Sequence, residues 1–332
     1  MIPGDAKMKA YVYDMDLPKK MKLVSDKSLS EPSDDEVQIK VSAASLNPIN
    51  YKLATFPGAS LAIGNNIIGS DFAGNVVSIG SKVSDIKVGD RVYGMARGSL
   101  AEYINCKTSR LAKVGTNTDI KEAAGAPCAA LTAYQGLKMV GALNSPSPIK
   151  ILIIGASGGV GHYAVQLAKA CNPADTTVIA VCSGKNSVFV KSIGADRVID
   201  YTDSSFDLPA AVNDADVVFD CVSPDTHYEE LSKKCLKPTG KYVCANSNRM
   251  VGDMLRKVVS GFLPFNLERD NFNLVMCDAN TKDLEDLAEL LEQGKLKTHV
   301  SRVFKFDETE LEEAFDVLKS QRAVGKLVVS ME

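Results

Sequence analysis

The chain contains 332 residues, with 38 basic and 41 acidic side chains, and therefore has a formal net charge of −3. Hydrophobic residues make up 45% of the chain and charged residues 24%. These proportions are typical of globular proteins and exclude a disordered, collagen-like or coiled-coil chain. At about 150 residues per domain, the length predicts two domains. Because nucleic-acid binding needs clustered Lys and Arg, the slight acidic excess argues against a DNA partner.

The eight cysteines are scattered, and the closest two, Cys235 and Cys244, lie nine positions apart (244 − 235). Without a Cys-x-x-Cys pair, this spacing favours neither a zinc knuckle nor a redox dithiol, and we expect reduced thiols. The first residues lack the basic and then apolar profile of a secretory signal, and no apolar stretch approaches the ~20 residues that span a bilayer. We therefore expect a cytoplasmic protein without a membrane span, and association with an organelle stays open.

Short strands separated by turns are predicted for the first 110 residues. Strand-like stretches occur at residues 10–13, 36–44, 71–79, 91–93 and 100–105, with glycine and proline between them. Many short strands with glycine-rich turns are typical of a compact β-barrel or sandwich. An alanine-rich helical segment begins near residue 121 and ends at a proline-containing linker, and we expect the change of domain there.

Beyond residue 150, apolar strands alternate with helices. The predicted strands are residues 150–154, 177–182, 197–199, 217–219 and 241–244, and the predicted helices are residues 159–171, 187–193 and 226–236. This alternation predicts a doubly wound parallel sheet that is covered on both faces. The tail leaves the alternation, with helices at 282–292 and from residue 308 and strands at 300–306 and 325–330. We expect it to fold back on the first domain.

The strongest local motif follows the first strand of this alternation. That strand runs directly into a turn of small residues, Ala156-Ser157-Gly158-Gly159-Val160-Gly161, and a helix follows. Small residues at the N-terminus of a helix allow a dinucleotide pyrophosphate to approach the backbone. We therefore expect the turn to bind a dinucleotide cofactor through Ser157, Gly158, Gly159, Val160 and Gly161.

The residues after the next strand predict which dinucleotide binds. An acidic residue about 20 positions beyond the glycines would select NAD through the ribose 2′-hydroxyl. The chain instead contains Ser183, Lys185 and Asn186 after Cys182. Their hydroxyl, ammonium and amide groups suit a 2′-phosphate. NADPH is therefore the predicted cofactor.

Several motifs resemble, in order along the chain, the medium-chain dehydrogenase/reductase family. Within it, they resemble the zinc-free quinone oxidoreductase and enone reductase branch, which includes zeta-crystallin and a plant chloroplast-envelope homologue. The motifs include SLNPINYK at 45–52, GSDFAGNVVSIGSKV at 69–83, AALTAYQGL at 129–137, GASGGVGHYAVQLAK at 155–169 and RAVGKLVV at 322–329.

The resemblance implies a mixed α/β fold with two domains. A GroES-like β-barrel catalytic domain would comprise residues 1–125 and 278–332, and a Rossmann NADPH-binding domain, residues 126–277, would lie between them in the chain. The resemblance also implies a homodimer. Further cofactor contacts are implied for Thr132, Tyr201, Val222, Ser223 and Arg322.

The same resemblance aligns Asn47, Ser70 and Cys128 with the zinc ligands of metal-dependent relatives. One soft ligand out of three cannot hold a catalytic zinc ion, and the first 127 residues contain one cysteine, Cys106, where a structural zinc site would need four. We therefore expect no metal. The Cys128 thiol is expected to pack in a helix, and the dispersed histidines, among them His162, are expected at surface or capping positions.

Without a metal, the hydride must go to an acceptor that is already electrophilic, such as a quinone or an α,β-unsaturated carbonyl. The candidate groups for the acceptor are Asn47, Asn50, Tyr51 and Lys52. In the resembling reductases, the lysine that matches Lys52 lies near cofactor and substrate, whereas Asn50 replaces an aspartate that is usual in the family. Two alternatives stay open: a reductase of 2-enoyl thioesters, and a non-catalytic NADPH-binding protein with a crystallin-like or RNA-associated role.

Overall fold

A computed structural model of the chain describes residues 7–14, 21–52, 66–171, 175–222, 230–231, 234–245 and 271–331. By its internal contacts the chain divides into two compact units. Unit 1 comprises Met1–Leu131 and Asp278–Glu332, and unit 2 comprises Thr132–Cys277. The boundary lies inside helix α4 (Pro127–Met139), whereas the sequence analysis places it just before this helix. One continuous helix therefore belongs to both units.

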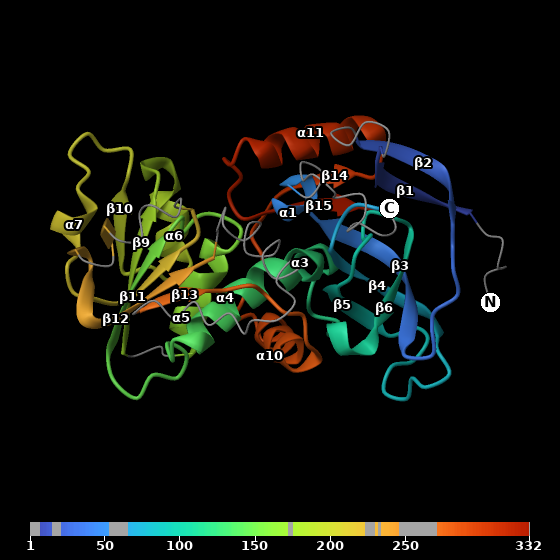
Figure 1. Ribbon diagram of the computed structural model, residues 1–332, viewed down its shortest axis with the longest axis horizontal. Coiled ribbons are helices and arrows are strands. Elements are labelled where there is room, and N and C mark those ends of the chain that lie inside the picture. The colour runs from blue at the N-terminus through green and yellow to red at the C-terminus, as the bar shows by residue number, and fades with distance from the viewer. Residues whose placement is uncertain are drawn as a thin grey trace, which may run out of the picture. The chain divides into compact units, whose positions relative to one another are not determined.

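Unit 1 is built on a seven-stranded sheet, in which the main path runs β14-β15-β3-β4-β5-β7 and β6 pairs with β3. Its strands are β3 (Glu36–Ser45), β4 (Asp71–Ile79), β5 (Arg91–Met95), β6 (Tyr103–Lys107), β7 (Leu111–Lys113), β14 (Val300–Lys305) and β15 (Lys326–Ser330). Its helices are α1 (Ile49–Lys52), α3 (Ile120–Gly125), the first part of α4, α10 (Thr281–Glu292) and α11 (Glu308–Lys319), with a 3-10 turn η2 (Thr108–Arg110). Because β15 pairs antiparallel with β3, the C-terminal tail completes a sheet that begins near the N-terminus (Figure 1).

A separate antiparallel pair of strands, β1 (Lys7–Tyr13) and β2 (Met21–Ser28), also belongs to unit 1. All side chains of β2 are exposed or half-buried and show no clear alternation, so this strand is not among the predicted ones. The strand predicted at 100–105 lies further along the chain, in β6.

The hydrophobic core of unit 1 combines residues from both ends of the chain. Ile39 and Phe72 of the sheet lie in one buried cluster with Leu311 and Phe315 of α11. Tyr11 stacks on Phe315 with ring centroids 5.8 Å apart. The shared apolar face of α11 is therefore buried against strands from the N-terminal part of the chain.

Helix α10 is fixed to the sheet of unit 1 at its first turn. Asn280 caps the helix by accepting a hydrogen bond from the Asp283 backbone N–H. The buried Tyr93 hydroxyl donates to the Leu284 carbonyl over 2.6 Å. Burial raises the pKa of Tyr93, which keeps this hydroxyl protonated.

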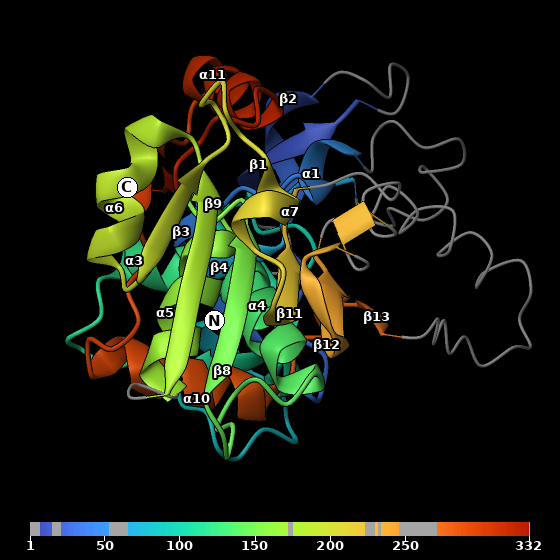
Figure 2. The same cartoon turned by 90° about the vertical axis from the view of Figure 1, so that its left-hand side faces the viewer.

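Unit 2 contains a six-stranded sheet with the order β10-β9-β8-β11-β12-β13, and every strand pair is parallel. Its strands are β8 (Ile149–Ile154), β9 (Thr176–Cys182), β10 (Arg197–Asp200), β11 (Ala215–Asp220), β12 (Leu236–Cys244) and β13 (Phe272–Leu274). The helices within its described residues are the second part of α4, α5 (Gly161–Cys171), α6 (Ser187–Ser192) and α7 (Leu208–Ala211), with a 3-10 turn η3 (Gly184–Asn186). Figure 2 shows these strands side by side. The predicted doubly wound parallel sheet is confirmed.

The chain order of the strands reverses between β8 and β11, which are neighbours in this sheet. In open parallel sheets, ligands bind outside the carboxyl ends of the strands at such a reversal.

One predicted element is wrong at its end: Leu236, assigned to a helix at 226–236, begins β12. Residues 223–229 and 232–233 lie outside the described residues.

Replacing Tyr93 tests how α10 is held. Tyr93→Phe removes the hydroxyl and keeps the ring, and we expect the free energy of unfolding to fall by about 1–2 kcal/mol because a buried hydrogen bond is lost. Urea unfolding followed by circular dichroism measures the change. The control Tyr103→Phe, at a half-buried position of β6, should stay within ~0.5 kcal/mol of the wild type. Equal stabilities of Tyr93→Phe and the wild type would contradict this role.

Candidate active site

The predicted glycine turn joins β8 to α5 in unit 2, at the strand-order reversal. Gly155 has a φ of +78°, which favours glycine, and residues 157–160 are half-buried. A Cβ atom on Gly161 would lie 2.2 Å from the Gly155 carbonyl oxygen, whereas one on Gly158 would meet that oxygen at 3.3 Å. Gly161 is therefore needed for the close approach of α5 to the turn, whereas a Cβ atom at Gly158 would require its neighbour to shift by a few tenths of an ångström.

Two side chains hold this turn from different directions. The His162 Nδ1 atom lies 2.9 Å from the Gly158 carbonyl oxygen. The Asn186 amide donates to the Ser157 hydroxyl over 3.0 Å. His162 is predicted at a surface or capping position; it is fully buried, so the surface position is wrong, and its contact with Gly158 lies at the start of α5. Asn186 connects the glycine turn with the loop after β9.

The groups predicted to select NADPH follow two neighbouring strands. Cys182 at the end of β9 pairs with Asp200 at the end of β10, and the Tyr201 N–H donates to the Cys182 carbonyl over 3.2 Å. Ser183 is buried, Lys185 is exposed, and Tyr201 is 55% exposed. The structure thus brings these three residues to the same edge of the sheet, where a hydroxyl pair and an ammonium group suit a phosphate dianion.

A carboxylate that the sequence analysis missed also lies at this edge. Oδ1 of Asp200 accepts hydrogen bonds from the Gly184 N–H (2.7 Å), the Thr202 N–H (2.8 Å) and the Thr202 hydroxyl (2.6 Å). The Thr202 hydrogen bonds are the main reason why the pKa of Asp200 is below its usual value. The signal that could have revealed Asp200 is the expected pairing of two adjacent parallel strands, which aligns Asp200 with Cys182. Asp200 holds the loop that contains Lys185.

Val222 lies on the other side of the glycine turn, after β11. A Cβ atom on Gly155 would lie 2.2 Å from the Val222 Cγ2 atom, and the Val222 side chain is 53% exposed. The Val222 N–H donates to the buried carboxylate of Asp220 over 2.9 Å, and the Tyr242 hydroxyl donates to the same carboxylate. Val222 is therefore held beside the turn, as a cofactor contact requires.

The structure describes two of the three remaining predicted cofactor residues. Thr132 is buried in α4, where unit 2 begins. Arg322 is exposed in unit 1, and its N–H donates to the Ser320 hydroxyl over 3.3 Å. Ser223 lies outside the described residues.

The four candidate catalytic residues form one short segment of unit 1, with different surroundings. Asn47 and Asn50 are buried, and Oδ1 of Asn50 accepts the Asn47 N–H over 2.8 Å. The Tyr13 hydroxyl donates to the Asn50 carbonyl, and burial raises the pKa of Tyr13 to about 12. Tyr51 and Lys52 are half-buried, and Tyr51 packs against the hydrophobic core. The two asparagines therefore shape the turn that presents Tyr51 and Lys52.

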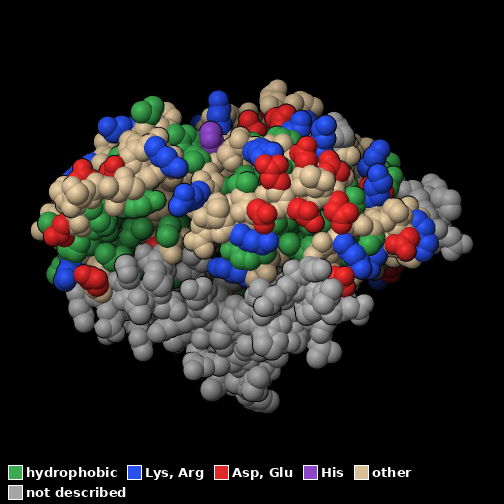
Figure 3. Space-filling model, turned by 90° about the horizontal axis from the view of Figure 1, so that it is seen from above, with side chains coloured by type: hydrophobic (Ala, Val, Ile, Leu, Met, Phe, Trp, Pro, Cys, Tyr) green, Lys and Arg blue, Asp and Glu red, His purple; other side chains and the backbone are tan. Residues whose placement is uncertain are grey.

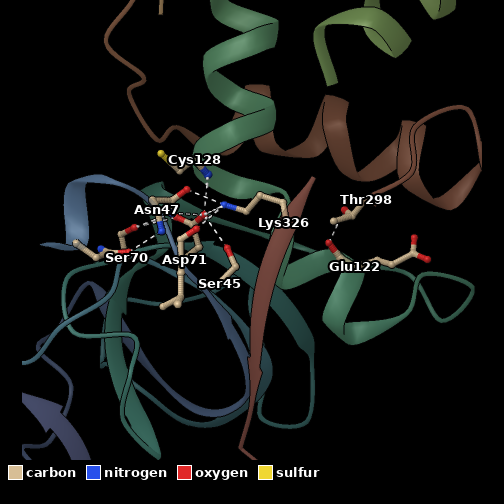
Figure 4. Close-up of polar contacts among 10 residues, drawn as sticks. Ser45, Asn47, Ser70, Asp71, Glu122, Cys128, Thr298 and Lys326 are labelled. Atoms are coloured by element: carbon tan, nitrogen blue, oxygen red, sulfur yellow. Dashed lines mark hydrogen bonds and ion pairs between the residues drawn. The ribbon is translucent and has the colours of Figure 1, made fainter. Parts of the chain in front are cut away.

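A buried polar cluster lies next to this segment (Figure 4). Asp71, which is fully buried, accepts hydrogen bonds from the Asn47 amide (2.8 Å), the Ser45 hydroxyl (3.1 Å), the Ser70 hydroxyl (3.0 Å) and the Cys128 N–H (3.2 Å). Desolvation raises the pKa of Asp71, and the nearby ammonium group of Lys326 opposes this rise. Neither Asp71 nor Lys326 is among the predicted site residues. The signal that could have revealed them is an acidic and a basic residue within apolar strand motifs.

This cluster contains the three residues that the resemblance aligns with zinc ligands. Asn47 and Ser70 contact each other over 3.4 Å, and both bind Asp71, as does the backbone of half-buried Cys128. An amide, a hydroxyl and one thiol beside a buried ammonium group do not fit a zinc ion. Among the residues that the structure describes, no group of three or more His, Cys, Asp and Glu side chains could hold a metal ion.

Comparisons with known proteins agree with this architecture. Residues 33–125 match the alcohol dehydrogenase GroES-like domain family, and residues 193–329 match the zinc-binding dehydrogenase family. A 2-methylene-furan-3-one reductase from Solanum lycopersicum is 34% identical, with 99% of this chain and 80% of the relative covered. An NADPH-dependent alkenal/one oxidoreductase, chloroplastic, from Arabidopsis thaliana is also 34% identical, with 97% and 79% covered.

The solved structures give the same result. The quinone oxidoreductase from Coxiella burnetii superimposes with a TM-score of 0.82 at 31% sequence identity, covering 98% of this chain and 100% of that one. The predicted fold class, a GroES-like domain with a Rossmann parallel sheet, is confirmed. The chain therefore belongs to the medium-chain dehydrogenase/reductase family.

Proposed function

We propose that the chain is an NADPH-dependent, zinc-independent reductase that transfers hydride to a quinone or an α,β-unsaturated carbonyl. The observation that carries this proposal is the glycine turn at the strand-order reversal of unit 2, with Lys185 and Tyr201 exposed at the same edge of the sheet. The names of the relatives, an alkenal/one oxidoreductase, a furanone reductase and a quinone oxidoreductase, support this class of acceptor.

Unit 2 supplies the groups that would hold the cofactor. Residues Ser157–Gly161 would present backbone to the pyrophosphate at the start of α5, and the 2′-phosphate would be held by Ser183, Lys185, Asn186 and Tyr201. Val222 bounds the turn toward β11. When bound, NADPH supplies the hydride. Thr132, Ser223 and Arg322 stay predicted cofactor contacts.

Unit 1 supplies the groups for the acceptor. Asn47 and Asn50 have their side chains engaged inside the protein, which favours a positioning role for both. The half-buried ammonium of Lys52 is suited to donate a hydrogen bond to the acceptor oxygen as it gains negative charge. Tyr51 contributes a ring that packs on the core. The reduced acceptor then needs one proton, and we propose water as its source.

An acceptor panel tests the proposed reaction. Oxidation of NADPH is followed by its absorbance with 9,10-phenanthrenequinone, 1,4-naphthoquinone, short-chain enones and a 2-enoyl thioester. We expect turnover with quinones or enones because these are electrophilic without a metal. Preference for the thioester would favour the alternative that the chain is a reductase of 2-enoyl thioesters. Tight NADPH binding with no turnover on any acceptor would favour the non-catalytic alternative and overturn the proposal.

A lysine substitution tests the choice of cofactor. Lys185→Ala removes the ammonium group from the loop after β9, and we expect the KM for NADPH to rise about tenfold while that for NADH stays constant, since a charge-assisted hydrogen bond to the 2′-phosphate is lost. Lys191→Ala, at an exposed position of α6, is the matched control. An unchanged ratio of NADPH to NADH activity in Lys185→Ala would contradict the assignment.

Two glycine substitutions separate folding from cofactor binding. Gly161→Ala places a methyl group against the Gly155 backbone, and we expect a loss of about 2–3 kcal/mol in stability without cofactor. Gly158→Ala places a methyl group 3.3 Å from the Gly155 carbonyl oxygen, a tight contact that a shift of a few tenths of an ångström relieves. Its stability should therefore change by less than ~1 kcal/mol while NADPH affinity falls, because the backbone must approach the pyrophosphate. Calorimetry with and without NADPH measures both. Full NADPH affinity in Gly158→Ala would count against the turn as pyrophosphate site.

We further propose a homodimer, a cytoplasmic location and no DNA partner. On the face drawn in Figure 3, basic and acidic side chains of the described residues are interspersed, which supports the absence of a DNA partner.

None of the helices within the described ranges is long and apolar enough to cross a membrane. The word chloroplastic in the name of one relative keeps association with an organelle open. Light scattering measures the oligomeric state.

A further inference from the structure

Lys326, at the start of β15, is a charged residue with 3% of its surface exposed. Its ammonium donates hydrogen bonds to the Asn47 Oδ1 atom over 2.6 Å and to the Leu46 carbonyl over 3.0 Å. The same nitrogen lies 3.9 Å from Oδ2 of Asp71. Figure 4 shows the Lys326 side chain pointing toward Asn47 and Asp71. Lys326 is therefore bonded to the backbone and side chain that lead directly into the segment with Tyr51 and Lys52.

Asp71 supplies the negative charge that compensates the Lys326 ammonium, and it leaves the hydrogen bonds of that ammonium to Leu46 and Asn47 intact. Its carboxylate accepts hydrogen bonds from Ser45, Asn47, Ser70 and the Cys128 backbone, so the anion is stabilised by several donors as well as by the ammonium. A buried ion pair needs such additional hydrogen bonds to offset its desolvation. The pair is electrically neutral as a unit, and the lysine is directed to Leu46 and Asn47.

Asn47 transmits this contact along the chain. Its carboxamide accepts from Lys326 through Oδ1 and donates to Asp71 through Nδ2, so the two partners of opposite charge determine which end of the amide faces which side. The Asn47 N–H donates to the Asn50 side chain, and the Asn50 N–H donates back to the Asn47 carbonyl. The turn of α1 that ends at Lys52 is thus built on Asn47.

We propose that Lys326 is a positioning residue of the reduction: with Asp71 it orients Asn47, and through Asn47 it fixes the α1 turn that presents Lys52 to the acceptor. The inference rests on the proposed function. Lys326 is buried and acts through Asn47. Displacement of a substrate-binding group by about 1 Å can lower a rate 100-fold, so a contact behind the site is sufficient to control the chemical step.

The test compares variants that keep, remove or balance the charge. Lys326→Arg keeps the charge, and Lys326→Met removes it and leaves Asp71 unpaired. The double variant Lys326→Met with Asp71→Asn removes both charges and is chosen so that the chain still folds. Steady-state rates with the best acceptor of the panel are divided by the concentration of NADPH-binding sites, measured by fluorescence titration, so that unfolded protein does not count.

We expect the double variant to bind NADPH within about twofold of the wild type and to lose 10- to 100-fold in kcat per binding site. Lys326→Arg, which keeps the charge, should lose less kcat per binding site than the double variant. The matched control is Lys113→Met with Asp90→Asn, which removes a 2.9 Å ion pair of the same unit outside the Asn47–Lys52 segment. Its kcat per binding site should equal that of the wild type, because a general loss of stability does not move this quantity.

A double-mutant cycle tests whether the effect passes through Asn47. If it does, Lys326→Met combined with Asn47→Ala lowers kcat no further than the more severe single variant. Independent, multiplying losses, or a wild-type kcat per binding site in the charge-free double variant, would overturn the inference while leaving the proposed function intact. A wild-type protein that reduces none of the acceptors overturns the proposed function, and this inference with it.

Discussion

The turn that holds the candidate catalytic residues of unit 1 depends on the burial of one lysine together with one aspartate. Lys326 and Asp71 are both removed from water, and their charges require several hydrogen-bond partners at one point. Those partners come from the end of β3, the residues after it, the residue before β4 and the start of α4. Satisfying the two charges therefore brings segments from the N-terminal part, the middle and the C-terminal tail of the chain together.

Unit 2 is constrained by backbone contact instead of buried charge. The helix after the first strand starts so close to the Gly155 carbonyl that Gly161 cannot carry a side chain. The same small residues leave peptide groups accessible at the strand-order reversal. Packing and cofactor binding consequently make the same demand on this turn, which is why a sequence motif of six residues identifies it so clearly.

The two halves of the proposed site differ in how they are encoded. The proposed cofactor contacts come from backbone and from a few side chains that follow adjacent strands, so they can be predicted from strand order. Acceptor binding depends on a short turn whose geometry comes from a cluster of side chains that are distant in sequence. At the positions that align with the zinc ligands of metal-dependent relatives, this chain has amide and hydroxyl groups that bind the Lys326–Asp71 pair. That pair organises the turn from Asn47 to Lys52.

The sequence by itself determined the doubly wound sheet, the glycine turn and the residues suited to a 2′-phosphate, because each follows from local periodicity or from one strand-turn-helix unit. It missed β2, whose exposed side chains show no pattern, and the carboxylate of Asp200, which reaches the loop of Lys185 only through strand pairing. It also selected Asn47 and Asn50 as catalytic candidates without showing that their side chains face inward. Only the tertiary structure decided those points and the partnership of Lys326 with Asp71, since hydrogen bonds between residues far apart in sequence exist only once the sheet has closed.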